Sequence, residues 1–301
     1  MTDAAIETAE LAKRYGRLTA LAGLTMSIPR GDVFGFLGPN GAGKTTAVKL
    51  LLGLARPTAG EARVLGAPLA DARAHREARR RVGYLPELFR YQGWLTAREV
   101  LALHAELAGL ERTTWDAELT RVLEVCGLAG RDGDRVATFS KGMQQRLGLA
   151  AALLGRPALV MLDEPTSALD PVGRHDVREI IRALKADGTT VFLNSHLLSE
   201  VEQVCDRVAI VDHGRVVASG TFAELLAGDT VVIRASGLGG TELSPFGTAD
   251  REGDRLIVRG ITAERIPDLV AALVRDGARI HEVRPMQETL EDRFLGLLSE
   301  R

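Results

Sequence analysis

The stretch Gly38-Pro39-Asn40-Gly41-Ala42-Gly43-Lys44-Thr45 decides the fold of this 301-residue chain. It follows an apolar run at residues 32–37, which predicts a buried strand, and it precedes a helix-forming run at residues 45–54. Glycines in such a loop let backbone N–H groups point inward, and the first turn of a helix adds partial positive charge. The order of strand, glycine loop and helix therefore predicts a phosphate-binding loop and not an ordinary turn.

Two side chains of this loop have expected roles. Lys44 is expected to reach the β- and γ-phosphates of a nucleotide, and Thr45 is expected to hold Mg²⁺. Its other residues are candidates for nucleotide binding through the backbone: Gly38, Pro39, Asn40, Gly41, Ala42 and Gly43.

A pair of carboxylates, Asp163-Glu164, follows the continuous apolar run at residues 158–162. Such a run is typical of a central parallel strand, and ligands of open α/β sheets lie at the carboxyl ends of strands. Asp163 is therefore a candidate Mg²⁺ ligand, and Glu164 is a candidate for orienting or activating a water molecule. The alternative is that this pair has only a structural role and caps the next helix.

Length and composition restrict the class of protein. The chain is long enough for about two domains, and its net charge of −2 shows no basic excess of the kind that nucleic-acid binders carry. The two cysteines, Cys126 and Cys205, have no metal-ligand spacing. No apolar run reaches the roughly 18 residues of a membrane span. Any role at a membrane is therefore expected to be peripheral.

The order of predicted elements gives two domains. Short alternating runs at residues 7–11 and 24–28 predict antiparallel strands, and strands alternating with helices predict a parallel sheet with crossover connections. Thr96 and Thr114 are expected to cap helices at residues 95–107 and 115–126. The pattern changes after residue 226, so we expect a first domain at 1–226 and a small α+β domain at 227–301.

Between the phosphate loop and the carboxylate pair lies Ser140-Lys141-Gly142-Met143-Gln144-Gln145-Arg146 at the start of a predicted helix. Together, these segments resemble the ATP-binding cassette (ABC) family over residues 7–226. The matching segments, in order, are Tyr15, the phosphate loop Gly38 to Thr46, the signature Ser140 to Gln144, Asp163-Glu164, the D-loop Ser167-Ala168-Leu169-Asp170, and His196. The fold implied is an α/β P-loop NTPase cassette with a mixed sheet core, an antiparallel β subdomain and a helical subdomain.

The resemblance implies an ATPase that uses ATP and Mg²⁺, with Glu164, His196 and Lys44 as catalytic residues. Tyr15 is at the position where the family stacks an aromatic ring on adenine, although an isolated tyrosine would more often be a surface aromatic. A lone His196 at a strand end would likewise usually be structural.

Four positions, Ser140, Gly142, Gln144 and Asp170, are expected to contact nucleotide across an interface. In the family, the signature faces the phosphate loop of a second subunit. Since the chain has one phosphate loop and one signature, a complete site needs two chains, and we expect a homodimer held by ATP. The implied partner is a separate integral-membrane permease at the cytoplasmic face of a bacterial membrane, acting in export. Residues 285–294 resemble the terminal helix motif of drug-exporter cassettes.

Two positions depart from the family pattern. Lys141 replaces a glycine, a variant associated with bacterial exporters, and Glu87 replaces a glutamine that contacts Mg²⁺ and the lytic water. Two unit charges of like sign about 4 Å apart repel by about 4 kcal/mol at an effective dielectric of 20. Glu87 is therefore expected to contact metal or water, or to lie outside the group of residues that surrounds the triphosphate.

Two other functions are compatible with a cassette fold. One is a soluble ABC ATPase that acts on nucleic acid or ribosomes, although the long coiled coils or paired cassettes usual for such proteins are missing here. The other is a regulatory cassette that does not hydrolyse ATP, against which the intact Lys44, Asp163, Glu164 and His196 argue.

Overall fold

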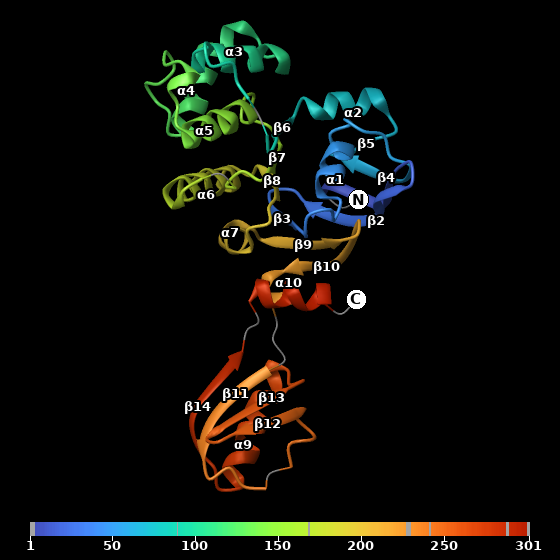
Figure 1. Cartoon of the computed structure of the whole chain (residues 1–301), viewed down its shortest axis with the longest axis vertical. Coiled ribbons are helices and arrows are strands. Elements are labelled where there is room, and N and C mark those ends of the chain that lie inside the picture. Colours follow the sequence, from blue (N-terminus) through green and yellow to red (C-terminus); the bar gives the residue numbers. More distant parts are fainter. Residues whose placement is uncertain are drawn as a thin grey trace. The chain divides into compact units, whose positions relative to one another are not determined.

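The computed structural model describes residues 4–88, 90–167, 169–226, 230–240, 242–286 and 289–299. The chain divides into two compact units, Met1–Thr221 and Phe222–Arg301 (Figure 1). The sequence predicts the boundary after Leu226, and Ala227 lies outside the described residues. The observed division falls earlier because helix α8 (Phe222–Leu225) contacts helix α10 (Leu290–Ser299) of the second unit.

The first unit contains two sheets. The antiparallel sheet has the order β2-β1-β4-β5 and the larger sheet the order β10-β9-β3-β8-β7-β6. The strands are β1 Ala4–Tyr15, β2 Leu18–Pro29, β3 Val33–Leu37, β4 Ala59–Val64, β5 Ala67–Pro68, β6 Val82–Leu85, β7 Leu159–Asp163, β8 Thr190–Asn194, β9 Arg207–Asp212 and β10 Arg215–Thr221.

The larger sheet is mixed, as predicted. Strands β6, β7, β8, β3 and β9 pair in parallel, while β10 pairs antiparallel with β9 through a hairpin. All five residues of β3, β7 and β8 are buried, which explains why these strands are continuous apolar runs. Their carboxyl ends lie at one edge of the sheet, where the predicted site residues follow.

Helices connect these strands. The helices of the first unit are α1 Lys44–Leu51, α2 Ala72–Arg79, α3 Ala97–Ala108, α4 Trp115–Val125, α5 Lys141–Ala152, α6 Pro171–Ala186 and α7 Leu198–Val204. Helices α3, α4 and α5 pack on one another and form a helical group of their own (Figure 1). This group corresponds to the helical subdomain that the sequence predicts.

The ends of two of these helices test the predicted caps. Thr96 caps α3 as expected, because its hydroxyl accepts from the Glu99 backbone and Glu99 bonds back to the Thr96 backbone. The prediction for Thr114 is wrong. Thr114 precedes α4 with a helical backbone (φ −97°, ψ −8°), its hydroxyl donates to the Glu111 carbonyl at 2.8 Å, and its side chain makes no capping hydrogen bond.

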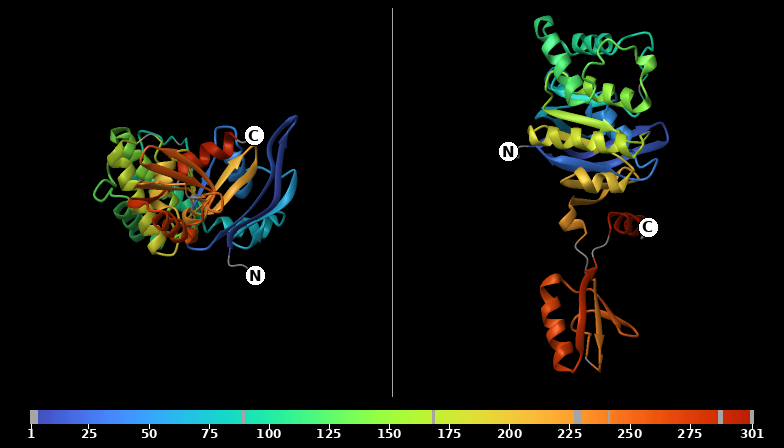
Figure 2. Two further views of the ribbon diagram at one scale, coloured as in Figure 1. Left: turned by 90° about the horizontal axis from the view of Figure 1, so that it is seen from below. Right: turned by 90° about the vertical axis from the view of Figure 1, so that its left-hand side faces the viewer.

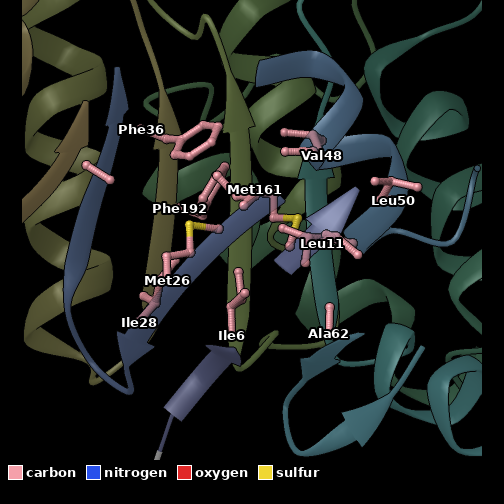
Figure 3. Packing of buried hydrophobic residues seen from close by; sticks show 14 of the residues in the cluster. Ile6, Leu11, Met26, Ile28, Phe36, Val48, Leu50, Ala62, Met161 and Phe192 are labelled. Carbon is pink, nitrogen blue, oxygen red and sulfur yellow. The ribbon is translucent and has the colours of Figure 1, made fainter. Parts of the chain in front are cut away.

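The core of the first unit joins both sheets to α1. Ile6 and Leu11 from β1 and Met161 and Phe192 from β7 and β8 lie in one buried cluster with Val48 of α1 (Figure 3). Phe192 lies between the rings of its neighbours on β3, with centroids 5.2 and 6.3 Å away. The cluster therefore fixes α1, and the loop before it, against the sheet.

The second unit is a small α+β domain. Its strands, β11 Thr230–Ser236, β12 Thr248–Glu252, β13 Arg255–Arg259 and β14 Arg279–Met286, form an antiparallel sheet with the order β12-β13-β11-β14. Helix α9 (Ile266–Arg275) lies on one face of this sheet, where Leu269 and Leu273 are fully buried (Figure 2). In the predicted terminal motif, residues 287 and 288 lie outside the described residues.

None of the helices in the described ranges has the length and apolarity that crossing a bilayer requires.

Candidate functional site

The predicted phosphate loop joins the end of β3 to the start of α1, and its glycines are required by close packing. A Cβ on Gly38 would lie 2.3 Å from the Val211 carbonyl oxygen, and one on Gly43 would lie 2.3 Å from that of Ala20. Gly43 also has a φ of 98°. Larger residues would displace the loop, so its shape depends on these two glycines.

Lys44 begins α1 and its ammonium group bonds to the loop itself. Its Nζ donates to the carbonyl oxygens of Gly38 at 2.6 Å and Pro39 at 3.2 Å. Burial lowers the pKa of Lys44, while the charges of Glu164, Asp163 and Glu87 oppose this shift. The lysine thus lies within the electrostatic field of all three carboxylates.

The remaining loop residues vary in exposure. Gly38 and Ala42 are buried, Pro39, Gly43 and Thr46 are partly buried, and Asn40, Gly41 and Thr45 are exposed. The hydroxyl-bearing Thr45 follows Lys44 in the first turn of α1, so it is accessible to a ligand at that helix end.

Asp163 is the last residue of β7 and is almost fully buried. Its Oδ1 accepts a hydrogen bond from Asn194 Nδ2 at the end of the adjacent β8. Burial raises the pKa of Asp163, and the charges of Glu87 and Glu164 raise it further. Neither Asp163 nor Glu164 caps a helix, because α6 begins later with Asp170 as its cap. The capping alternative is therefore wrong.

Glu164 turns out of β7 with a left-handed backbone. Its φ is 52°, an uncommon value for a residue other than glycine, and its N–H donates to the Asn194 carbonyl at 2.9 Å. Its Oε2 lies 2.8 Å from His196 Nδ1. The Glu164 side chain is 10% exposed and that of His196 is 52% exposed, so the pair spans the boundary between protein and solvent.

Asn194 is the site residue that sequence reasoning missed. Its side chain holds Asp163, its carbonyl holds the Glu164 backbone, and its Oδ1 is buried without a hydrogen-bond partner among the described residues. The available signal was its position, since Asn194 ends an apolar strand immediately before Ser195-His196. Its role depends on β7 lying beside β8, which the sequence does not show.

Glu87 lies after β6 at the margin of this group. It is exposed, and its charge acts on Lys44, on Asp163 and on Tyr84, whose pKa is raised to about 12 mainly by burial. Its predicted contact with metal or water stays a prediction.

Tyr15 ends β1 with 47% of its surface exposed, and Lys13 Nζ lies 4.8 Å from its ring centroid. A flat ring in this position is available for stacking on a base. The predicted adenine contact is compatible with this exposure.

The signature residues lie around a separate cavity of about 390 Å³ between the starts of α5 and α6. Ser140 caps α5 by accepting from Met143 N at 3.2 Å, and Asp170 caps α6 by accepting from Gly173 N at 2.8 Å. Gln144 Nε2 donates to the Phe139 carbonyl at 3.2 Å. Ala168 of the predicted D-loop lies outside the described residues.

The cavity is lined by Ser140, Lys141, Gly142 and Asp170, among others. No residue of the phosphate loop is among the described residues that line it. The structure therefore brings Lys44, Asp163, Glu164, Glu87 and His196 into one electrostatic group, and it places the signature and Asp170 in another.

Comparisons with known proteins identify the family of this chain. The family model for ABC transporters matches residues 21–167. An uncharacterized ABC transporter ATP-binding protein of Synechocystis is 38% identical over 98% of this chain and 85% of its own length. A daunorubicin resistance ATP-binding protein of Streptomyces coeruleorubidus is also 38% identical, over 99% of this chain and 96% of its own.

A solved structure described as the ATP-binding subunit of an ABC transporter matches with a TM-score of 0.66 and 34% identity, over 73% of this chain and 91% of that one. The predicted cassette fold is thereby confirmed. The chain belongs to the ATP-binding subunits of ABC transporters, the family of cassettes that bind ATP and hydrolyse it to power transport.

Proposed function

We propose that two copies of this chain bind Mg²⁺·ATP between them and, by closing and hydrolysing it, drive a separate membrane permease that exports its cargo. The observation that carries this proposal is the joint placement of Lys44, Asp163, Glu164 and His196 at the carboxyl ends of β3, β7 and β8.

Binding of the triphosphate begins at the phosphate loop. Lys44 Nζ now bonds to two loop carbonyls, and the β- and γ-phosphate oxygens of ATP would take over these bonds as charge-assisted ones. The N–H groups of the loop and of the first turn of α1 supply the remaining donors. Tyr15 stacks on the adenine ring.

The residues present fit a magnesium ion. Among the described residues there is no cluster of three or more side chains able to enclose a metal, but Mg²⁺ commonly uses one or two carboxylates with waters and phosphates. The buried Asp163, the unpartnered Oδ1 of Asn194 and the exposed Thr45 hydroxyl form such an incomplete donor set. Asp163 and Thr45 would hold the ion, Glu87 would contact it directly or through water, and the charge on the transferring phosphoryl group would be neutralised there.

Glu164 acts as the base that positions the attacking water. Its carboxylate is held at 2.8 Å by His196, and its backbone is held by Asn194, so its direction is fixed before substrate binds. The proton of the water passes to Glu164 as the new oxygen–phosphorus bond forms and the bond from the γ-phosphorus to the bridging oxygen breaks, which releases ADP. The half-exposed imidazole of His196 orients this carboxylate and reaches toward the γ-phosphate.

The signature completes the site of a second copy. The Ser140 hydroxyl accepts a bond from its own helix, yet its O–H remains able to donate to a phosphate oxygen. Gly142 and the start of α5 add backbone donors and a positive dipole end. Because the signature cavity contains no phosphate-loop residue among those described, a γ-phosphate bound by Lys44 of one copy would meet Ser140 of its partner.

The permease contact is proposed at the surface around Glu87 and α3. Leu88 and Trp94, in the segment between β6 and α3, are 86% and 70% exposed and are available for contact with a partner. A relative named for daunorubicin resistance supports export as the direction. The cytoplasmic face of a bacterial membrane is the location that this partner requires, and the C-terminal unit is proposed as an accessory domain.

The partner can be identified by affinity purification of the full chain from membranes solubilised in detergent. We expect a multi-spanning membrane protein to be recovered in stoichiometric amount, and replacement of Trp94 with glutamate to reduce that recovery. Recovery with ribosomes or DNA, and without a membrane protein, would contradict the proposal.

A further inference from the structure

A second cavity lies at the opposite end of the parallel strands from the ATP site. It has a volume of about 500 Å³, and Ala158 and Thr190, at the amino ends of β7 and β8, are among its lining residues. Asp163 and Asn194 end these same strands, so about 13 Å of extended chain separates the two locations. The cavity is thus distinct from the site described above.

Four arginines line this cavity: Arg30 after β2, Arg81 before β6, Arg121 on α4 and Arg156 before β7. Asp187 is the single carboxylate residue among the described residues that line it. Glu118 pairs with Arg121, so three guanidinium groups remain against one acid, and the cavity keeps a net positive charge.

Two of these arginines are engaged with protein groups. Arg121 bonds Glu118 at 2.6 and 2.9 Å and donates to the Leu153 carbonyl at 2.8 Å, near the end of α5. Arg30 also has an interaction partner within the protein. Arg121 thus has an ordinary structural use, since cations at helix carboxyl ends balance the helix dipole.

Arg81 and Arg156 have no comparable structural role. Throughout the described ranges, neither guanidinium group forms a hydrogen bond or an ion pair, although the charge of Arg156 helps to lower the pKa of Glu118. Both side chains belong to exposed residues, and neither takes up a helix carbonyl. Helix capping therefore does not account for them.

The backbone at Arg156 is an independent indication. Its φ is 51°, in the left-handed region, and it lies between Gly155 with a φ of 73° and Pro157. This conformation is unfavourable for an L-residue with a long side chain and is further restricted before proline. Glycine or asparagine would hold this turn with less strain, so the arginine contributes something other than the turn itself.

We propose that this cavity binds a small multivalent phosphate anion, with Arg81 and Arg156 as its principal ligands. The planar fork of guanidinium matches the oxygens of a phosphate group, and the cavity volume falls in the range of small-molecule sites. Arg81 precedes β6 at the edge of the parallel sheet, and Arg156 lies in the connection from helix α5 to β7. A bound anion therefore ties these two parts of the first unit together.

Isothermal titration of the full chain with pyrophosphate tests the proposal, with saturating ADP present to fill the phosphate loop. Arg81→Gln/Arg156→Gln is the test variant. Arg73→Gln/Arg76→Gln on α2 is its control, because it removes the same charge from exposed residues outside the cavity. Retained ADP binding shows that each variant is folded.

We expect one saturable pyrophosphate site per chain in the wild type and in the control variant. Binding to the test variant should be roughly tenfold weaker for each arginine removed, since each loses charge-assisted bonds to the anion. Absence of saturable binding to the wild type, or equal weakening in both variants, would overturn the proposal. So would binding to phosphatidylglycerol vesicles that requires the arginine pair in the absence of any pyrophosphate binding, because the ligand would then be a lipid headgroup.

Discussion

Replacing His196 with alanine tests whether this histidine positions the catalytic carboxylate. The change removes one hydrogen bond, 2.8 Å long, between His196 Nδ1 and Glu164 Oε2. Other contacts of Glu164 remain, because its backbone is still held by Asn194 at 2.9 Å. The variant therefore changes the direction of the carboxylate without removing the base.

The expected loss follows from the exposure of the pair. A hydrogen bond to a charged group contributes about 1.5–3 kcal/mol. His196 is 52% exposed, so water competes for its partner and the lower end applies. If this bond orients the base in the transition state, a loss of about 1.5 kcal/mol lowers kcat about tenfold. The free energy of unfolding should change by no more than about 0.5 kcal/mol, as for most exposed positions.

The assay is phosphate release at saturating Mg²⁺·ATP, together with thermal unfolding of the same samples. His213→Ala is the matched control, since His213 is 87% exposed and lies 3.8 Å from an acid, Asp212, outside the proposed catalytic group. The control should retain wild-type kcat. His196 does not position Glu164 if His196→Ala keeps more than half of the wild-type kcat, or if the variant loses activity only through unfolding.

Two further substitutions test how buried charged groups affect the free energy of unfolding. Asp163→Asn should abolish hydrolysis but raise the free energy of unfolding at pH 7. The folded state raises the pKa of Asp163 above its ordinary 3.8, so the ionised carboxylate disfavours folding. The wild type therefore loses stability as the pH rises from 3.8 through the folded-state pKa of Asp163. Urea unfolding at pH 4 and pH 7 checks this, and a variant no more stable than the wild type at pH 7 contradicts it. Arg178→Ala should cost about 3–5 kcal/mol, because it leaves the buried Glu200 without its partner at 2.7 Å. Arg182→Ala, which breaks an exposed pair on the same helix, should cost less than about 1 kcal/mol, and equal losses in urea for the two variants would refute the burial argument.

Strands with continuous apolar runs were predictable from sequence, and strands of exposed, charged or small residues were not. The apolar runs that predicted β3, β7 and β8 lie in the middle of the mixed sheet, where only apolar residues fit. Strands β4 and β12 were missed because their residues are largely exposed and charged or small. The apolar pattern of residues 261–275 predicts one helix, but α9 begins at Ile266, because a 3₁₀ turn (Ala263–Arg265) precedes it.

The site was predictable where a motif is continuous in sequence, as in the phosphate loop and the Asp163-Glu164 pair. The positions of these two motifs relative to each other could be predicted only with the order of the strands in the sheet. Only with β7 beside β8 do Asn194 and His196 meet the carboxylates, and crossover connections leave that order unspecified in sequence. The Thr114 prediction failed because the preceding 3₁₀ turn holds Thr114 in a helical conformation, whereas a capping residue has the extended backbone that Thr96 adopts.

Ser140 offers a way to test the shared site without unfolding the chain. Aspartate is as good a helix cap as serine, so Ser140→Asp should keep α5 intact while placing a negative charge against the γ-phosphate of the partner copy. Ser140→Asn preserves the cap without charge and serves as its control.

Sedimentation velocity of the Glu164→Gln variant, with and without Mg²⁺·ATP, tests whether ATP joins two copies of this chain. We expect a monomer without nucleotide and with ADP, and a dimer with ATP. Adding Ser140→Asp should abolish that dimer, whereas adding Ser140→Asn should not. A chain that binds ATP in this variant and still sediments as a monomer would contradict this expectation.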